Sequence, residues 1–312
     1  MKIIRYTEDK KAEWDRFVDQ SKNGTFLLKR GYMDYHADRF QDCSFLFYND
    51  DDELVALLPA NRKDDVLYSH QGLTYGGFMM SLKTRAHEPM LWFEALTEEL
   101  KKESIKKLVY KPVPHIYHRY PAEEDLYALF RMGATLSVRN LATVIDMQHP
   151  IAASRMKRAR KRARKGRLTV RECDDVNLFW EIIERDRMER HQVHPVHRAS
   201  ELELLKKNFP ENIRFFIVCQ DETDILAGGV IFHTGQVLHL QYAAATEYGK
   251  EIYATDVLYD ELIHHIFPEA AYFDFGTSNE RQGTFLNVGM TEHKEEFGGR
   301  SVVYDTYEIE IK

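Results

Sequence analysis

The sequence has 312 residues and a mass of 36.7 kDa, which exceeds one ordinary domain and fits two domains of about 150 residues each. With 44% hydrophobic and 30% charged residues, the composition excludes a disordered chain, a collagen-like repeat and a disulfide-stapled miniature. The formal net charge is -7, yet residues 155–167 (RMKRARKRARKGR) hold nine basic side chains and no acidic one. So local an excess of positive charge indicates an anionic partner, or neutralisation by the protein's own carboxylates.

The sequence lacks the usual features of membrane-spanning, secreted and disulfide-bonded proteins. No apolar run approaches the ~20 residues of a membrane-spanning helix, and residues 1–14 lack the apolar segment of a secretory signal. We therefore expect a cytoplasmic protein with no membrane span. Cys43, Cys173 and Cys219 are odd in number and far apart, which indicates neither a disulfide framework nor a thiolate zinc site.

Helical stripes alternate with strand-like runs along the first half, which predicts an α/β (α+β) chain. We expect helices at residues 10–20, 87–103 and 123–132, and strands at 44–48, 53–59, 107–111 and 134–146. Pro150, next to His149 and close to the basic run, places the domain boundary at 147–153. The predicted domains are therefore residues 1–150 and 151–312.

The second half repeats the plan of the first. The basic run is predicted to be a helix, followed by helices at 176–189, 201–208 and 255–266. Strands are expected at 168–172, 214–219, 225–233, 236–245, 272–275 and 301–311. Each half then holds an antiparallel meander, a helix, a strand, another helix and a final long strand.

The segment 237–245 (VLHLQYAAA) is predicted to be a strand that leads towards a helix. His239 and Gln241 lie on the face opposite Tyr242, and the alanines at 243–245 leave the backbone open to a ligand. Main-chain amides here, and a helix N-terminus at Thr255, could polarise a carbonyl or hold a phosphate. The alternative is an ordinary central strand whose small residues pack against a helix.

Two segments near the C-terminus carry polar groups just past predicted strands. Residues 272–281 (YFDFGTSNER) place Asp274 and Glu280 at a strand end, where α/β proteins commonly bind ligands, and either carboxylate is a candidate base. Lys294 lies in a predicted loop closed by glycines, where it could contact an oxyanion or a phosphate. The alternative is a solvated lysine paired with Glu295 or Glu296.

Histidines and arginines give two further candidate sites. His191, His194 and His197 are spaced by three, but Pro195 prevents a shared helical face, so a substrate-contacting loop or plain surface histidines are favoured over a metal site. The basic helix has two interpretations, an anion-binding surface or a solvated helix paired with nearby acids. Its candidate anion-binding residues are Arg158, Arg160, Arg162 and Arg164.

Several segments together resemble a known family. Residues 158–172, 240–246 (LQYAAAT), 273–276 (FDFG) and 293–298 (HKEEFG) resemble, in order and spacing, the second half of the Fem-type (FemABX) branch of the GNAT acyltransferase superfamily. Residues 57–59 and 68–78 resemble its first domain. The resemblance implies two GNAT-like domains, each a mixed, mostly antiparallel sheet flanked by helices, with the active site in the second.

The resemblance also implies a reaction, in which an amine attacks an activated acyl carbonyl directly and no metal takes part. The carrier would be acyl-CoA or aminoacyl-tRNA, and the acceptor a small molecule or a cell-wall or glycan precursor that bears an amine. Only Gly249 remains of the glycine-rich loop that grips CoA, and no helical-hairpin insertion for tRNA is present, so the donor stays open between these two.

The resemblance assigns Lys294 to the donor end and to the tetrahedral intermediate. Candidate donor-binding residues are Tyr242, Ala243, Ala244, Ala245, Thr246, Gly249 and Thr255. Candidate substrate-binding residues are His191, His197, Gln241 and Tyr75. We expect Lys294→Ala to reduce turnover by orders of magnitude with little change in melting temperature.

Two other classes of function remain open from the sequence. One is a binding module that kept the fold, lost catalysis and docks RNA or anionic glycan precursors through the basic helix. The other is a structural protein with no small ligand. The motifs G-x-x-x-x-G-K-[ST], G-x-G-x-x-G and G-x-S-x-G are absent, which removes the usual signatures of P-loop, dinucleotide-binding and α/β-hydrolase proteins.

Overall fold

The computed structural model describes the backbone of residues 1–312 and every side chain except those of Arg190 and His191. The chain forms two compact units. The first comprises residues 1–140, 281–285 and 303–312, and the second comprises 141–280 and 286–302. The last ten residues therefore belong with the first unit, whereas the sequence analysis groups them with the second half. Among the described helices none is long and apolar enough to cross a bilayer.

The first unit contains many short strands. Its helices are α1 (Lys11–Gln20), α2 (Arg30–Met33), α3 (Glu88–Lys102) and α4 (Glu124–Arg131). Its strands are β1 (Lys2–Arg5), β2 (Gln41–Asp42), β3 (Phe45–Tyr48), β4 (Leu54–Leu58), β5 (Asn61–Lys63), β6 (Val66–Tyr68), β7 (Met79–Met80) and β8 (Lys107–Tyr110). One set of strands has the order β1-β3-β4-β7. The other has the order β17-β8-β6-β5-β2, and it includes most of the terminal strand β17 (Arg300–Glu310). Apart from the parallel pair β6–β8, these neighbours are antiparallel.

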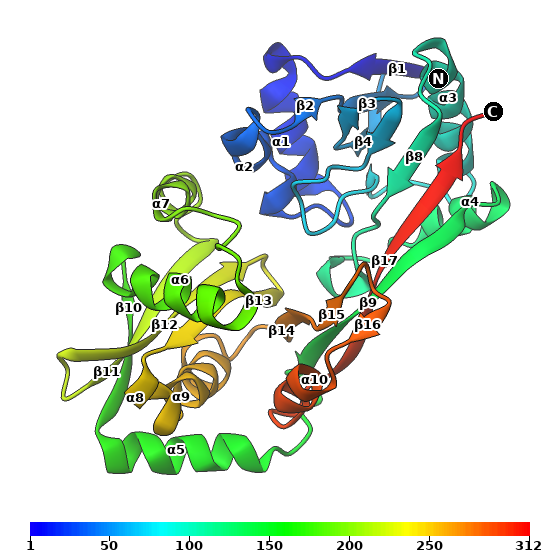
Figure 1. Ribbon diagram of the computed structural model, residues 1–312. Helices are drawn as coiled ribbons and strands as arrows, with labels where there is room; N and C mark the ends of the chain where they lie inside the picture. The colour runs from blue at the N-terminus through cyan, green and yellow to red at the C-terminus, as the bar shows by residue number, and fades with distance from the viewer. The chain divides into compact units, whose positions relative to one another are not determined.

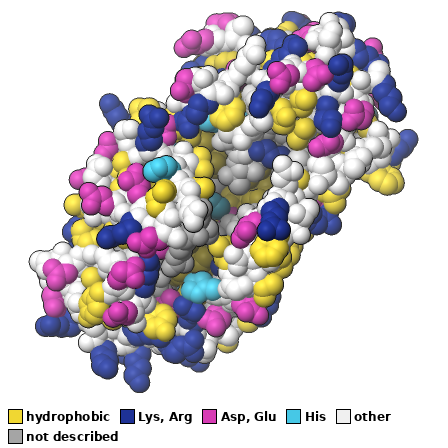
Figure 2. All heavy atoms as spheres, in the orientation of Figure 1, with side chains coloured by type: hydrophobic (Ala, Val, Ile, Leu, Met, Phe, Trp, Pro, Cys, Tyr) yellow, Lys and Arg dark blue, Asp and Glu magenta, His cyan; other side chains and the backbone are white. Residues whose placement is uncertain are grey.

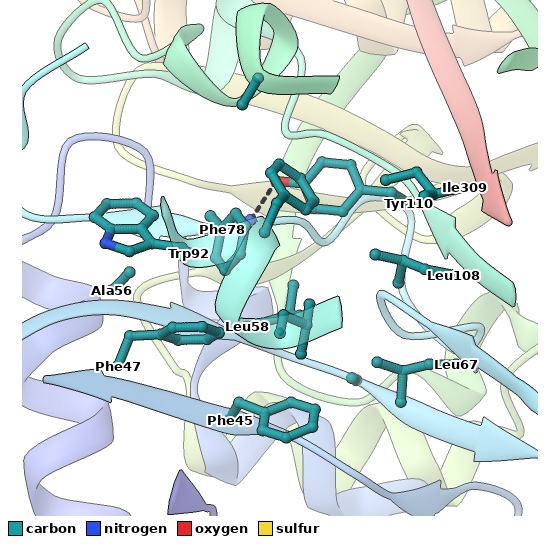
Figure 3. Close-up of a cluster of buried hydrophobic side chains, with 14 of the residues drawn as sticks. Phe45, Phe47, Ala56, Leu58, Leu67, Phe78, Trp92, Leu108, Tyr110 and Ile309 are labelled. Carbon is teal, nitrogen blue, oxygen red and sulfur yellow. Dashed lines mark hydrogen bonds between the residues drawn. The ribbon is translucent and has the colours of Figure 1, made fainter. Parts of the chain in front are cut away.

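Aromatic packing fills the core of the first unit (Figure 3). Phe78 makes edge-to-face contacts with Phe47, Trp92 and Phe93 at ring-centroid distances of 4.9–5.4 Å. Its main-chain N–H donates to the Tyr110 hydroxyl at 2.6 Å, which satisfies a polar group inside this apolar cluster. Helix α3 covers the core because its apolar residues recur at helical spacing, from Pro89 through Trp92 and Phe93 to Leu100.

The second unit is built on one continuous sheet (Figure 1). Its strand order is β10-β11-β12-β13-β14-β9, from β10 (Leu168–Cys173), β11 (Ile213–Gln220), β12 (Asp224–His233), β13 (Val237–Ala245), β14 (Tyr272–Thr277) and the end of β9 (Thr135–Asp146). Its helices are α5 (Ser154–Gly166), α6 (Asn177–His191), α7 (Ala199–Asn208), α8 (Glu247–Glu251), α9 (Ala254–Glu261), a π-helical turn at Leu262–Ile266, and α10 (Val288–Glu295). Two short strands, β15 (Asn279–Glu280) and β16 (Phe285–Leu286), form a small ribbon.

Two adjacent glycines show that helices cover both faces of this sheet. A Cβ atom on Gly228 would lie 2.2 Å from the ring of Phe179 in α6, and one on Gly229 would lie 2.9 Å from Leu258 in α9. Neighbouring strand residues point to opposite faces, so α6 and α9 pack on opposite sides of β12. The apolar core on the α9 side includes Phe273 and Phe275 of β14.

The expected fold class is confirmed. Each unit has a mixed, mostly antiparallel sheet with helices packed on it, as the alternation of helical stripes and strand-like runs predicted. The prediction of a loop around Lys294 was wrong, because residues 288–295 form helix α10, whose N-terminus is capped by the side chain of Asn287.

Candidate active site

Two neighbouring strands of the second unit separate part-way along their length. β13 and β14 run parallel and pair at three positions, the last of which is His239 with Asp274. Beyond this point β13 continues along β12 as far as Ala245, while the pairing of β14 with β9 becomes irregular. We call this separation the fork (Figure 1). A fork exposes main-chain groups that a continuous sheet would pair, so it can accept a ligand.

The β13 side of the fork contains a β-bulge. Leu240 lies opposite Ile231 and Tyr242 lies opposite Val230, so Gln241 is the extra residue. A bulge changes the direction of the main-chain N–H and C=O groups locally, which suits a strand edge that must hold a ligand carbonyl. After the bulge, Ala243, Ala244 and Ala245 pair with residues 227–229 of β12.

At the base of the fork a histidine and an aspartate form a hydrogen-bonded pair. His239 Nδ1 lies 2.8 Å from Asp274 Oδ2, and the main-chain N–H of Gly276 donates to Asp274 Oδ1 at 2.7 Å. Asp274 is fully buried, whereas 14% of the His239 side chain is exposed. Of these two side chains the imidazole is therefore the one that solvent reaches. From the sequence, Asp274 was a candidate base and His239 was only a residue on one strand face.

Lys294 lies against the end of β14. Its ammonium donates to the carbonyl oxygens of Gly276 and Thr277 at 2.9 and 3.1 Å, and to the Ser278 hydroxyl at 2.9 Å. Burial lowers the pKa of Lys294 to about 8, and the nearby Asp274 carboxylate opposes that shift. The three N–H bonds of the ammonium are matched by these three acceptors. Lys294 therefore holds the turn that follows the fork and is not a solvated lysine paired with Glu295 or Glu296.

The other candidate base, Glu280, lies in a different environment. It is exposed on β15, and its carboxylate accepts a hydrogen bond from the Asn287 side chain at 3.1 Å. No other contact of its carboxylate is described. Nothing in this environment would adapt Glu280 to proton transfer.

Three of the candidate donor-binding residues are already bonded or packed within the second unit. Tyr242 is buried below β13, where its hydroxyl contacts His197 Nδ1 at 2.9 Å and its ring packs on Trp180. Thr246 is the N-cap residue of α8, and its hydroxyl accepts a hydrogen bond from the N–H of Gly249 at 3.0 Å, so that amide is already occupied. A Cβ atom on Gly249 would lie 2.3 Å from a carbonyl oxygen of β12, which shows that this glycine serves close packing.

The first turn of α9, which contains Thr255, carries a buried carboxylate. Asp256 is 1% exposed and forms ion pairs with Arg155 at 2.9 Å and with Arg162 at 3.1 Å. The Arg162 guanidinium also stacks on the Tyr253 ring at 3.7 Å. This carboxylate already complements the positive end of the helix dipole, so a pyrophosphate would compete with it for the same position.

The candidate substrate-binding residues are not gathered at one place. His197 is 6% exposed and packs on Phe232, and Gln241 is the partly exposed bulge residue. Tyr75 is a buried residue of the first unit whose hydroxyl lies 3.0 Å from that of Thr25. The side chain of His191 lies outside the described residues. In the described part of the chain, no cluster of three His, Cys, Asp or Glu side chains with metal-binding geometry is found.

The basic helix α5 has two chemically different faces. On its inner face Arg155 and Arg162 pair with Asp256, and Arg160 pairs with Asp260 at 2.9 Å. Arg160 and Arg162 thus have carboxylate partners on α9, as the second interpretation of the basic helix expected. Arg158 bonds the Ser154 hydroxyl at 2.9 Å.

The outer face of α5 remains strongly positive. Lys157, Lys161, Arg164 and Lys165 are exposed, and no ion pair of these four is described in the structure. With Arg160 they line a shallow surface hollow of ≈ 520 Å³. Figure 2 shows Lys and Arg side chains gathered along the lower edge of the view, where Figure 1 draws α5.

Comparison with known proteins identifies this fold. Residues 152–294 match the family model described as the acetyltransferase (GNAT) domain. The crystal structure of FemX is similar with a TM-score of 0.71 at 12% identity, covering 99% of this chain and 97% of that chain. L-PGS from Bacillus licheniformis is similar with a TM-score of 0.61 at 10% identity, covering 96% and 91%.

A tandem GNAT protein from the clavulanic acid biosynthesis pathway has a TM-score of 0.55 at 12% identity, covering 100% of this chain and 98% of that chain. A search of curated protein sequences found no match. Residues 152–294 of the second unit thus resemble a GNAT domain, and the chain as a whole has the same fold as FemX. The fold that the Fem-type resemblance implied is confirmed.

Proposed function

We propose that this protein transfers an acyl group from an activated carrier to an amine at the fork between β13 and β14. The observation that carries the proposal is the fork itself, which opens a main-chain edge beside a histidine–aspartate pair. The GNAT match over residues 152–294 covers both strands of the fork and extends to Lys294. The similarity to FemX and to a tandem GNAT protein supports the same class of reaction.

The chemistry follows from the groups at the fork. The acyl carbonyl lies along the edge of β13 after Gln241, where main-chain N–H groups stabilise the negative charge that develops on its oxygen. The amine attacks the carbonyl carbon, a C–N bond forms, and the bond from carbon to the carrier oxygen or sulfur breaks. No covalent intermediate with a protein side chain is required.

Lys294 supports this reaction as a positioning residue. It fixes the turn of residues 276–278 through three hydrogen bonds and places a positive charge close to Asp274. A positive charge in a poorly hydrated site stabilises a neighbouring oxyanion more strongly than it would in water. Its ammonium need not leave its three acceptors to act in this way.

We infer that the carrier is an aminoacyl ester of tRNA rather than acyl-CoA. Where a CoA enzyme would offer free amides to a pyrophosphate, this chain has the short helix α8 with its Gly249 amide bonded to Thr246. The first turn of α9 is occupied by Asp256 and its arginines. The acceptor is an amine of a small molecule or glycan precursor, the class that the Fem-type resemblance implies.

An assay of label transfer tests the proposed function. The protein is incubated with labelled aminoacyl-tRNA or labelled acetyl-CoA and with a panel of amines that includes amino sugars and peptide-bearing glycan precursors. Mild alkali hydrolyses the ester and thioester donors but leaves an amide intact. We expect alkali-stable label attached to the amine to form from aminoacyl-tRNA and not from acetyl-CoA. The opposite donor preference would refute the tRNA inference, and no stable label from either donor would refute acyl transfer.

The outer face of α5 favours a second candidate function, the docking of RNA. Four exposed cations on one helix face, with no described ion pairs, create a field that attracts a phosphate backbone. Helix α5 contains no aromatic residue, so it would contact the backbone and not stack on bases. The proposed tRNA donor supplies such a backbone, and a non-catalytic RNA-binding protein would use the same face.

The salt dependence of tRNA binding tests this candidate. We compare the wild type with a variant in which Lys157, Lys161, Arg164 and Lys165 are replaced by Gln. The slope of log affinity against log salt should become shallower by about 3, because each phosphate contact contributes ~0.7–0.9 to that slope. The control replaces four exposed lysines of the first unit, Lys63, Lys83, Lys101 and Lys102, and should leave the slope unchanged. Equal slopes for both variants would exclude α5 as the RNA-binding face.

A further inference from the structure

We propose that His239, held in place by Asp274, is the base that removes the proton from the attacking amine. This inference rests on the acyl transfer proposed above and assigns the proton-transfer step of that reaction to a named residue. It also replaces the carboxylates of Asp274 and Glu280, which the sequence had suggested as candidate bases.

The position of the pair in the sheet is the first argument. His239 and Asp274 form the last parallel pair before β13 and β14 separate. Phe273 and Phe275 pack into the core on the α9 side, so Asp274 between them points to the opposite face of the sheet. The imidazole of His239 meets it there, at the base of the fork.

Burial and charge give the second argument. The Asp274 carboxylate is fully buried, and its two oxygens receive hydrogen bonds from His239 Nδ1 and from the Gly276 amide. Donation from Nδ1 fixes the tautomer in which Nε2 carries the lone pair of the neutral ring. When Nε2 takes up a proton, the adjacent carboxylate stabilises the imidazolium that forms.

The C-terminal end of β14 lies close to this histidine. Gly276 has φ = +71°, a backbone conformation that L side chains rarely adopt, and a Cβ atom there would lie 3.4 Å from Cε1 of His239. Lys294 holds the same segment through the carbonyl oxygen of Gly276. The aspartate therefore holds the ring directly, and the lysine fixes Gly276, whose amide bonds the same carboxylate.

Two other histidine–aspartate pairs in the structure lack these features. The His149 side chain is 81% exposed next to Asp146. His264 contacts Asp260 at 3.1 Å, but that carboxylate also pairs with Arg160. Neither pair involves β13 or β14, so His264 provides a matched control.

The proton that His239 takes up leaves with the carrier. Nε2 of His239 takes one proton from the protonated acceptor amine, the neutral amine then attacks as the carbonyl π electrons move to oxygen, and the extra proton on the new C–N nitrogen passes to solvent. The tetrahedral intermediate then collapses, the bond from carbon to the carrier oxygen breaks, and the proton on Nε2 passes to that oxygen. The ring returns to its starting state, and Asp274 stays ionised throughout.

The test compares His239→Gln with His264→Gln in the label-transfer assay between pH 6 and pH 9. For an amine that is protonated at neutral pH we expect His239→Gln to lower kcat/KM by about 10²–10⁴-fold at pH 7. The deficit should shrink as pH rises, because the amine then loses its proton to solvent. With hydroxylamine, which is unprotonated at neutral pH, the deficit should be smaller. His264→Gln should retain the wild-type profile.

Asp274→Asn provides a readout that does not depend on turnover. In ¹⁵N-histidine NMR spectra of the wild type, His239 should show the Nδ1–H tautomer, and Asp274→Asn should abolish that preference. If the wild type transfers label and His239→Gln has the same rate and pH profile, His239 is not the base. That result would leave acyl transfer intact. A wild-type protein that transfers no label from either donor would refute acyl transfer itself, and the base assignment with it.

Discussion

Replacing Lys294 by methionine is expected to reduce acyl transfer by about 10²–10³-fold, the effect of removing one preorganised electrostatic contact from an active site. The same change should lower the free energy of unfolding by ~2–4 kcal/mol, because two part-buried carbonyls and a buried hydroxyl lose their shared donor. This differs from the expectation from sequence alone, which left the melting temperature nearly unchanged. The measurements are label transfer at a temperature where the variant is folded, and urea unfolding.

A second buried lysine separates the effect on activity from that on stability. Lys22 of the first unit is 6% exposed and forms an ion pair with Glu124, so Lys22→Met should also destabilise the protein. It lies outside the fork and should keep the turnover of the wild type. If Lys294→Met and Lys22→Met lose activity in proportion to their loss of stability, Lys294 has no specific role in the reaction.

Asp256→Asn is expected to destabilise the second unit. Asp256 is buried and binds two arginines of α5, so an asparagine leaves Arg155 and Arg162 without their shared carboxylate. Breaking a buried ion pair in this way costs about 3 kcal/mol, which for a unit of this size lowers the melting temperature by ~6–12 °C. Thermal unfolding followed by tryptophan fluorescence measures the shift, since Trp180 lies in the second unit.

Asp221→Asn is the matched control for this prediction. Asp221 pairs with Arg167 at 2.7 Å, but both side chains are exposed, so the substitution should cost less than about 1 kcal/mol. Equal shifts for Asp256→Asn and Asp221→Asn would show that the ion pairs between α5 and α9 do not hold the basic helix in place.

The long elements were predictable from the sequence because their patterns are regular. β11, β12 and β13 are runs of eight to ten residues dominated by apolar side chains, and α3 has a buried stripe at helical spacing. Each therefore carries enough residues for its period to be recognised. The strands β2 and β7 have two residues each, too few for any period, and they form because partner strands supply their hydrogen bonds.

Helix α10 was missed because its pattern is weak. It contains Gly289 and buries a threonine and a lysine where an amphipathic helix would bury apolar residues. The helix is fixed by its Asn287 cap and by the bonds that Lys294 makes to the turn after β14. A local pattern does not reveal such contacts between distant segments.

The candidate site was predictable in part. The strand 237–245 and the aspartate after it were selected from the sequence, but the partner of Asp274 lies 35 residues away and is set by the parallel register of two strands. The neutralisation of the basic helix depends on contacts about a hundred residues apart, such as that of Arg160 with Asp260. The number of charges along the sequence does not show which arginines of α5 face α9 and which cations face solvent.

A crystal structure with a stable donor analogue tests the central claim most directly. The probe is the 3′-aminoacyl-amide of a CCA trinucleotide, which mimics the end of aminoacyl-tRNA and does not hydrolyse. We predict that its acyl carbonyl lies in the fork, with the oxygen about 3 Å from main-chain N–H groups of β13 and the carbonyl carbon facing His239. An acyl group bound away from β13 and β14 would contradict the account.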